Sequence, residues 1–169
     1  MFATGHTRVL QVQFFASPLY LFSGCQDPEP EPALVNSVNP LIGTDSEYAF
    51  SHGNTYPAVA LPFGMTSWTP QTGKRFSSWI YQHDVNSIVG FRATHQASVW
   101  RGDYGQFSLM PVTGDLVLDV EDRRTTFSRE NEFAAPHVYR THLDKYGIDV
   151  EMSPTLRCAI FRMTPAQPG

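Results

Sequence analysis

Residues 138–152 read VYRTHLDKYGIDVEM, and this stretch decides the fold class. From Ile148 to Met152 apolar residues alternate with acidic ones, which is the period of a strand with one buried and one solvated face. A second apolar run, residues 138–143, precedes it. The four residues from Asp144 to Gly147 are typical of a hairpin turn in which glycine takes a positive φ angle. The stretch therefore predicts two antiparallel strands joined by a tight turn.

The chain continues in the same manner on the N-terminal side of this hairpin. Its apolar runs are short, turn residues such as Gly114 and Asp115 separate them, and no helical period is sustained. Many short strands at close spacing favour a sandwich of two sheets. We therefore predict an all-β fold, a partial antiparallel β-sandwich. The expected strands are residues 59–61, 64–68, 78–82, 87–94, 106–110, 116–120, 138–143, 148–152 and 158–163.

The N-terminal residues have the composition of an export signal. Arg8 precedes a mostly apolar stretch, residues 9–22, which is too short and too interrupted by Gln and Pro for a membrane-spanning helix. A cysteine directly after Ser23 and Gly24 resembles the lipobox of bacterial lipoproteins. We therefore expect a signal peptide over residues 1–24 and acylation of Cys25. The alternative is a secretory signal with a chance cysteine.

Alternating proline and glutamate follow Cys25, and such a sequence forms an extended, charged spacer rather than a core. We assign residues 25–35 to an acidic, Pro-rich tether and residues 36–169 to the β-sandwich domain. An acyl chain at Cys25 would hold the protein to a membrane. The expected location is the bacterial cell envelope, as an outer membrane lipoprotein that faces either the periplasm or the surface.

Charge and cysteine content narrow the range of functions. The net charge is −4 and no basic stripe is present, so the composition gives no case for binding nucleic acid. The pair 123–124, two arginines beside Glu121 and Asp122, predicts a solvated turn. Cys158 has no partner if Cys25 is acylated, so we expect a buried free thiol on a strand. The sequence contains no CxxC pair and its histidines are scattered, which gives no support for a transition-metal site.

Residues 90–107, GFRATHQASVWRGDYGQF, hold the strongest candidate for a binding site. Trp100 offers a flat aromatic face, and His95, Gln96 and Asp103 offer hydrogen-bonding groups beside it. Loops on a rigid sheet often carry binding residues, and an aromatic face beside hydrogen-bonding groups is typical of a sugar-binding site. The alternative is an ordinary surface loop whose tryptophan packs on a neighbouring strand.

The order of residues in this segment resembles the hallmark loop of family 92 glycoside hydrolases, the calcium-dependent exo-acting α-mannosidases. Other blocks resemble the family in the same order, and together they cover about residues 36–164. These blocks are NPLIGT at 39–44, NTYPAVALPFGM at 54–65, WTPQT at 68–72, FSRENE at 127–132, APHVY at 135–139 and SPTLRC at 153–158. The chain departs from the family at Val99, where the closest variant has proline.

The resemblance implies a galactose-mutarotase-like N-terminal β-sandwich followed by a helical (α/α)-barrel domain. The resemblance also implies that this sandwich is incomplete at its C-terminus and that the C-terminal helical domain is missing. In the family, the two catalytic carboxyl groups and the calcium ligands come from the helical domain. We therefore expect no catalytic residue and no metal ligand in this chain, with calcium bound only in the full-length enzyme. Glu47, Asp84 and Glu132 have no partner that the sequence identifies.

The same resemblance makes Trp100 a sugar-stacking platform near the leaving-group subsite. His95, Gln96 and Asp103 then either bond sugar hydroxyls or fix the loop, and Gly43 with Thr44 brings backbone close to the sugar. The expected function is the substrate-pocket domain of an exo-acting α-mannosidase that removes terminal mannose, with α-1,2 as one candidate linkage. The fragment alone should be inactive. The alternative is a non-catalytic, carbohydrate-binding surface lipoprotein module, and a third outcome is a chain that does not fold alone.

Overall fold

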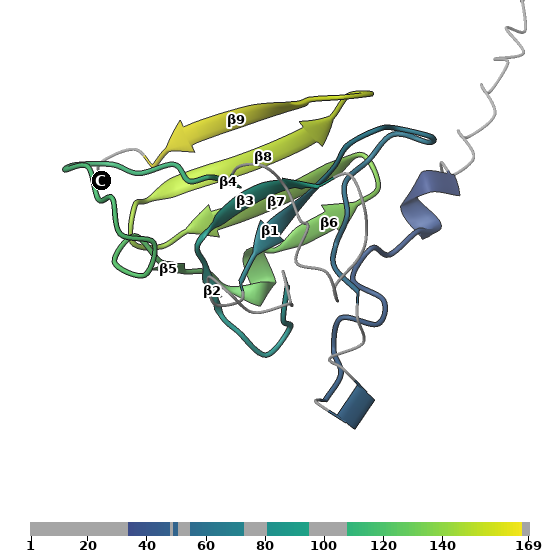
Figure 1. Cartoon of the computed structure of the whole chain (residues 1–169), viewed down its shortest axis with the longest axis horizontal. Coiled ribbons are helices and arrows are strands. Elements are labelled where there is room, and N and C mark those ends of the chain that lie inside the picture. The colour runs from purple at the N-terminus through teal and green to yellow at the C-terminus, as the bar shows by residue number, and fades with distance from the viewer. Residues whose placement is uncertain (1–33, 48, 51–54, 73–80, 95–107, 167–169) are drawn as a thin grey trace, which may run out of the picture. The chain divides into compact units, whose positions relative to one another are not determined.

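A computed structural model describes residues 34–47, 49–50, 55–72, 81–94 and 108–166, all of which lie within the unit of residues 32–169. Figure 1 shows its strands, and all pairings between the described strands are antiparallel. The elements are η1 (Leu34–Ser37), β1 (Ser67–Gln71), β2 (Ser87–Ile88), β3 (Gly90–Thr94), β4 (Ser108–Leu109), β5 (Thr125–Thr126), η3 (Arg129–Asn131), β6 (Phe133–Ala135), β7 (Val138–Leu143), β8 (Ile148–Pro154) and β9 (Ala159–Pro165).

The predicted hairpin forms the centre of the largest described sheet, which has the order β6-β7-β8-β9. β7 has the predicted bounds, and β8 extends two residues beyond them to Pro154. Gly147 has φ 57° and donates its N–H to the Leu143 carbonyl (2.8 Å), as the predicted turn requires. A second described sheet has the order β1-β3-β4, and β2 pairs with β5. The all-β, antiparallel sandwich is therefore confirmed.

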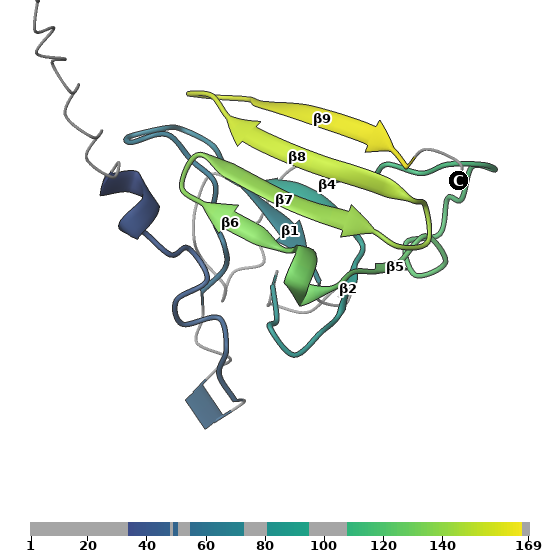
Figure 2. The same ribbon diagram turned by 180° about the vertical axis from the view of Figure 1, so that it is seen from behind.

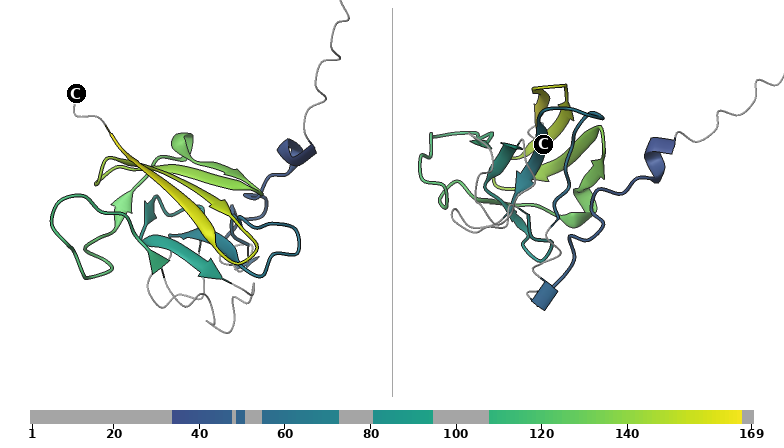
Figure 3. Two further views of the ribbon diagram at one scale, coloured as in Figure 1. Left: turned by 90° about the horizontal axis from the view of Figure 1, so that it is seen from above. Right: turned by 45° about the vertical axis from the view of Figure 1, so that its right-hand side comes forward.

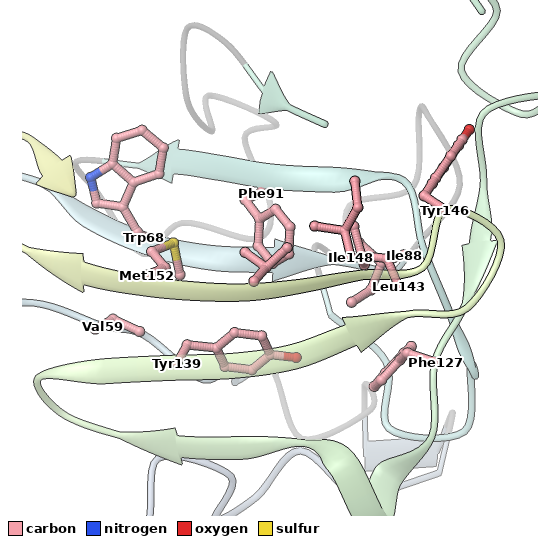
Figure 4. Packing of buried hydrophobic residues seen from close by; sticks show 11 residues of the cluster. Val59, Trp68, Ile88, Phe91, Phe127, Tyr139, Leu143, Tyr146, Ile148 and Met152 are labelled. Atoms are coloured by element: carbon pink, nitrogen blue, oxygen red, sulfur yellow. The ribbon is translucent and has the colours of Figure 1, made fainter. Parts of the chain in front are cut away.

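The core lies between the two larger sheets. Seen from behind in Figure 2, β6, β7, β8 and β9 lie in front of β1, and the views in Figure 3 show the two layers from other sides. Side chains from both sheets meet between them (Figure 4). Trp68 of β1 packs edge-on against Phe161 of β9 with ring centroids 5.1 Å apart, and Phe91 of β3 packs against Tyr139 of β7 at 6.3 Å. β8 buries alternate residues, which confirms the period read from the sequence.

Residues 116–120 were predicted as a strand, and this prediction is wrong. Leu116 and Leu118 are 76% and 78% exposed and belong to no described strand. The Asp119 carboxylate accepts the backbone N–H groups of Glu121 (2.8 Å) and Asp122 (3.2 Å), so the chain turns there instead of extending. Gly114 does adopt a positive φ of 79°, but no strand begins directly after it, and the next one is β5 at Thr125.

Cys158 is exposed, which corrects the expected buried thiol. The residue lies in the turn before β9. Its N–H donates to the Thr155 hydroxyl (2.9 Å), and its carbonyl accepts the Thr155 N–H (2.8 Å). This tight turn carries the side chain away from the core.

The other predicted strands differ from the structure in their bounds. Residues 87–94 divide into β2 and β3, which belong to different sheets, and the strand expected at 64–68 begins three residues later. At 59–61 only Val59 forms a bridge, to Trp68. Of the strand expected at 78–82, only residues 81–82 are described, and they are not in a strand. Of the strand expected at 106–110, the described part contains the short β4. The last strand covers 159–165 instead of 158–163, and β5 and β6 were not predicted.

Candidate functional site

The register of β1 and β3 fixes where the predicted binding segment leaves the sheet. Thr94, the last residue of β3, pairs with Ser67, the first residue of β1. The turn before β1 is tied to the same end of the opposite sheet, because Met65 N–H donates to the Leu156 carbonyl (2.8 Å) and Ala60 N–H to the Pro136 carbonyl (3.0 Å). We call this region the Thr94 end of the sandwich.

The turn at the Thr94 end presents apolar side chains to solvent. Phe63 is fully exposed, and Met65 and Leu156 are each 60% exposed. Phe63 has φ 58°, the left-handed region, which for a bulky residue costs about 1–3 kcal/mol. Gly64 closes the turn by donating to the Leu61 carbonyl (2.9 Å), and a Cβ there would lie 3.0 Å from that oxygen. The surrounding turn thus holds Phe63 outward in a conformation that its own backbone disfavours.

Four of the six predicted sugar-binding residues, His95, Gln96, Trp100 and Asp103, lie outside the described residues, as does Cys25. Gly43 and Thr44 are described. Gly43 has φ 82°, and a Cβ on it would lie 3.2 Å from the Thr55 hydroxyl oxygen, so the backbone approaches another segment closely there. Thr44 is buried, and its hydroxyl and N–H both donate to the Leu41 carbonyl (2.8 and 3.1 Å).

The next residue, Asp45, shows where this turn lies on the sheet. Its carboxylate is 3.6 Å from His83 Nδ1, and His83 follows Gln82, which contacts Thr72 just after β1 ends. Ser67 and Thr94 are at the other end of β1. The described contacts therefore do not bring Gly43 and Thr44 together with Thr94. Their contact with a sugar stays a prediction, as does the role of the four residues beyond Thr94.

Two arginines hold the end of β1 opposite to the Thr94 end. Gln82 N–H donates to the Thr72 hydroxyl (2.7 Å), which joins the two ends of the segment between them. Arg124 donates to the Thr72 carbonyl (3.0 Å) and the Ser87 hydroxyl (2.9 Å) while pairing with Glu121 (2.8 Å). The turn predicted around the arginine pair is present, but Arg124 reaches inward and only 22% of its side chain is exposed.

The second arginine, Arg129, belongs to a buried polar cluster that the sequence did not reveal. Its guanidinium donates to the carbonyls of Gln82 (3.2 Å) and Val85 (3.0 Å) and to the Glu132 carboxylate (2.6 Å). Glu132, of which 2% of the side chain is exposed, also accepts the hydroxyls of Tyr81 (2.9 Å) and Tyr139 (2.7 Å). The only signal in the sequence was an arginine and a glutamate three residues apart, with Glu132 directly after the short helix η3.

The protonation of this cluster defines its chemistry. Burial raises the pKa of the Tyr81 hydroxyl well above its usual value, and the neighbouring Glu132 carboxylate raises the pKa further. The same two causes raise the pKa of Tyr139. Both tyrosines therefore stay protonated and donate to Glu132. With three donors on a carboxylate that is closed to solvent, Glu132 fixes the fold and is not placed to exchange a proton with a substrate.

The outer face of the β6–β9 sheet carries a hollow of about 410 Å³. Its charged groups pair with one another across the strands. Arg140 donates to Glu151 (2.6 Å), Arg162 lies 3.5 Å from the same carboxylate, and His142 Nδ1 is 2.7 Å from Asp149. The residues that line it are Asn131, Arg140, Thr141, His142, Asp149, Val150, Glu151, Arg162 and Thr164.

Among the described residues, no three His, Cys, Asp or Glu side chains lie close enough together to hold a metal ion. Glu47 and Asp84 are exposed, and Glu132 is occupied by its donors. Within the same part of the chain, no helix has the length and hydropathy that a bilayer crossing needs.

These features define a class of protein: an antiparallel β-sandwich whose segment rich in aromatic and hydrogen-bonding residues departs from one end of the sheets. The family model described as glycosyl hydrolase family 92 N-terminal domain matches residues 37–168. The chain therefore belongs to glycosyl hydrolase family 92, and the matched region is its N-terminal domain.

Solved structures agree with this assignment. An inverting family GH92 mannosidase from Bacteroides thetaiotaomicron is 45% identical over 79% of this chain, with a TM-score of 0.72. A family GH92 α-mannosidase from the same organism, solved with mannoimidazole, is 33% identical over 78% of this chain, with a TM-score of 0.66. The chain spans 18% of the length of each. No match is found among the curated proteins.

Proposed function

We propose that this chain supplies the sugar-facing N-terminal domain of an exo-acting α-mannosidase that removes terminal mannose, with α-1,2 linkages as the first candidate, from glycans. The observation that carries this proposal is the 45% identity to an inverting mannosidase across 79% of the chain. The second similar structure holds mannoimidazole, a ligand whose name indicates a mannose-like ring, and this supports a mannose-containing substrate.

Bond cleavage is assigned to parts of the enzyme beyond this domain. Inversion needs one carboxyl group as acid and another as base, about 6.5–9.5 Å apart. The one buried carboxylate described here, Glu132, is held by Tyr81, Tyr139 and Arg129. We therefore place the acid, the base and the calcium site in a C-terminal helical domain, and we expect no release of mannose by the chain alone.

Within this division, the role of the chain is to bind and orient the sugar. Trp100 would stack on the apolar face of the ring, and His95, Gln96 and Asp103 would bond its hydroxyls or brace their own segment. Gly43 and Thr44 would supply close-approaching backbone. The rigid pairing of Ser67 with Thr94 supports this role, because a sheet with fixed register holds the start of that segment in place.

We further propose that Cys25 is acylated and anchors the protein in the bacterial cell envelope, with residues 25–35 as the tether. The Ser-Gly-Cys order at residues 23–25 supports this. Incorporation of radioactive palmitate into the chain expressed in a Gram-negative host is the expected result. Cys25→Ala should abolish it, whereas Cys158→Ala should leave it unchanged. Equal labelling of the Cys25→Ala chain would refute the anchor.

A chimaera tests the enzymatic role. Residues 37–168 replace the matched N-terminal region of the inverting mannosidase, and mannose release from α-mannosides is measured. We expect activity, and we expect Trp100→Ala to lower kcat/KM at least tenfold, which corresponds to about 1.4 kcal/mol of lost transition-state binding. Phe133→Ala, which removes a half-exposed aromatic ring from β6, is the matched control and should change little. A folded chimaera without activity would contradict the proposal.

A further inference from the structure

The face of the β1-β3-β4 sheet that points away from the core carries polar side chains. Trp68 and Phe91 point into the core (Figure 4), so the alternate residues of their strands point to the opposite face. Residues that pair directly across an antiparallel ladder share a face. The residues of this opposite face are Thr69 and Gln71 in β1, Gly90, Arg92 and Thr94 in β3, and Ser108 in β4. We call it the Arg92 face, and none of these residues is acidic.

Arg92 lies in the middle of this face without a counter-ion. Its neighbours across the ladder are Thr69 and Ser108. None of the ion pairs in the described part of the chain includes Arg92, and its Nε atom is buried without a hydrogen-bond partner. Burial lowers the pKa of Arg92, but a guanidinium stays protonated in proteins. A half-buried cation of this kind costs free energy that a bound anion would offset.

Two other half-buried arginines show how this fold stabilises an arginine with a structural role. Arg124 pairs with the Glu121 carboxylate, and Arg129 pairs with the Glu132 carboxylate. Each guanidinium also donates to a backbone carbonyl of another segment. Arg92 has neither kind of partner among the residues that the structure describes. Its charge is therefore not explained by the packing of the sandwich.

Two further polar groups of the Arg92 face lack partners. Ser108 Oγ is buried without a hydrogen-bond partner. The Gln71 side chain is buried, and its amide forms no hydrogen bond with the described residues. Gly90 pairs with Gln71, and a Cβ at Gly90 would overlap the Ser108 hydroxyl. Glycine at this position therefore leaves room for the hydroxyl beside the guanidinium, where both can reach one ligand.

We propose that the Arg92 face binds an oxyanion, either free or carried by a sugar as an acidic group. The guanidinium presents N–H donors in a planar fork that fits two oxygens of such a group. The Ser108 hydroxyl and the Gln71 amide can donate to its remaining oxygens. The face offers a positive charge and donors, and no carboxylate of its own repels the ligand. This inference concerns binding by the chain alone and does not rest on the proposed cleavage of mannosides.

Isothermal titration calorimetry of the full chain at constant ionic strength tests the site. Inorganic phosphate represents the free anion, glucuronate a carboxylate on a sugar, and glucose the neutral sugar of the same shape. We expect saturable binding of phosphate, glucuronate or both, and none of glucose. Arg92→Met keeps an unbranched apolar stem without the charge and should weaken the binding about tenfold or more. Arg162→Met removes the same charge from an exposed position on the other sheet and should leave the affinity unchanged.

The outcomes separate the source of the anion from the existence of the site. Binding of phosphate alone assigns the face to a free anion, and tighter binding of glucuronate assigns it to an acidic sugar. Absence of both, binding of glucose equal to that of glucuronate, or an equal loss in Arg92→Met and Arg162→Met would overturn the inference.

Urea denaturation without added anion tests the alternative that Arg92 is structural. Arg92→Met should not lower the urea midpoint, because Arg92 has no described partner to lose, whereas a clear fall would assign the residue to the fold. Ser108→Ala is a second variant that keeps the charge and removes one donor. It should stay folded by circular dichroism and bind the anion more weakly, and unchanged affinity in this variant would contradict the proposed site.

Discussion

Replacing Glu132 by glutamine should destabilise the chain more than any neutralisation of a surface carboxylate. Glu132 is buried and accepts hydrogen bonds from Tyr81, Tyr139 and Arg129. Glutamine keeps the volume but offers a single acceptor oxygen and leaves the Arg129 charge without its counter-ion. Loss of a hydrogen bond to a charged group costs about 1.5–3 kcal/mol, and breaking a buried pair costs about 3–5 kcal/mol. We expect the free energy of unfolding to fall by about 3 kcal/mol.

Urea denaturation followed by tryptophan fluorescence and by circular dichroism measures this change. Glu151→Gln is the matched control, because Glu151 pairs with Arg140 on the outer face, where 54% of the Arg140 side chain is exposed. Such a pair contributes about 1 kcal/mol or less. If Glu132→Gln lowers the stability by less than about 1 kcal/mol, comparable to Glu151→Gln, the cluster does not anchor the fold and the reasoning fails.

Other measurements follow from the same structure. Burial and Glu132 raise the pKa of Tyr81 above 10.0, and likewise that of Tyr139, so both tyrosines ionise at lower pH in the unfolded chain than in the folded one. The free energy of unfolding should therefore be at its full value below pH 10 and fall above it, by up to about 1.4 kcal/mol per pH unit for each tyrosine. A urea midpoint that stays constant from pH 9 to 11 would contradict this. Cys158 should react with a maleimide in the native chain at the rate of an unfolded control, whereas protection until denaturant is added would show a buried thiol. Calorimetric titration of the chain alone with mannose oligosaccharides should be flat, because the proposed sugar pocket also needs groups from outside this domain. Binding that is lost on Trp100→Ala would favour the carbohydrate-binding module instead.

The sequence was sufficient for the fold class because period and turn chemistry agreed in one stretch. The alternation from Ile148 to Met152 correctly predicted which face of β8 is buried, and Gly147 correctly predicted the turn before it. The leucines at 116 and 118 failed because an apolar alternation predicts a strand only where a neighbouring strand accepts it. There the Asp119 carboxylate accepts hydrogen bonds from the backbone N–H groups of residues 121 and 122, so the chain forms a turn.

The candidate site was predictable only in part, because its contacts join segments far apart in the chain. The family resemblance located the sugar-binding candidates, and family 92 membership is confirmed, but their individual contacts stay predictions. No local pattern could show that Glu132 meets Tyr81, 51 residues earlier. The exposure of Phe63 could not be predicted either. An apolar residue between proline and glycine can point to the core or to solvent, and only the register of β1 with β3 fixes the position of this turn.

The antiparallel pairing of β3 with β4 has a consequence for how this domain can vary. Phe91 faces Leu109 and Arg92 faces Ser108, so the residues between 94 and 108 begin and end on adjacent strands of a single ladder. A segment mounted in this way can be exchanged for a longer, shorter or differently composed one while the ladder beneath it is unchanged.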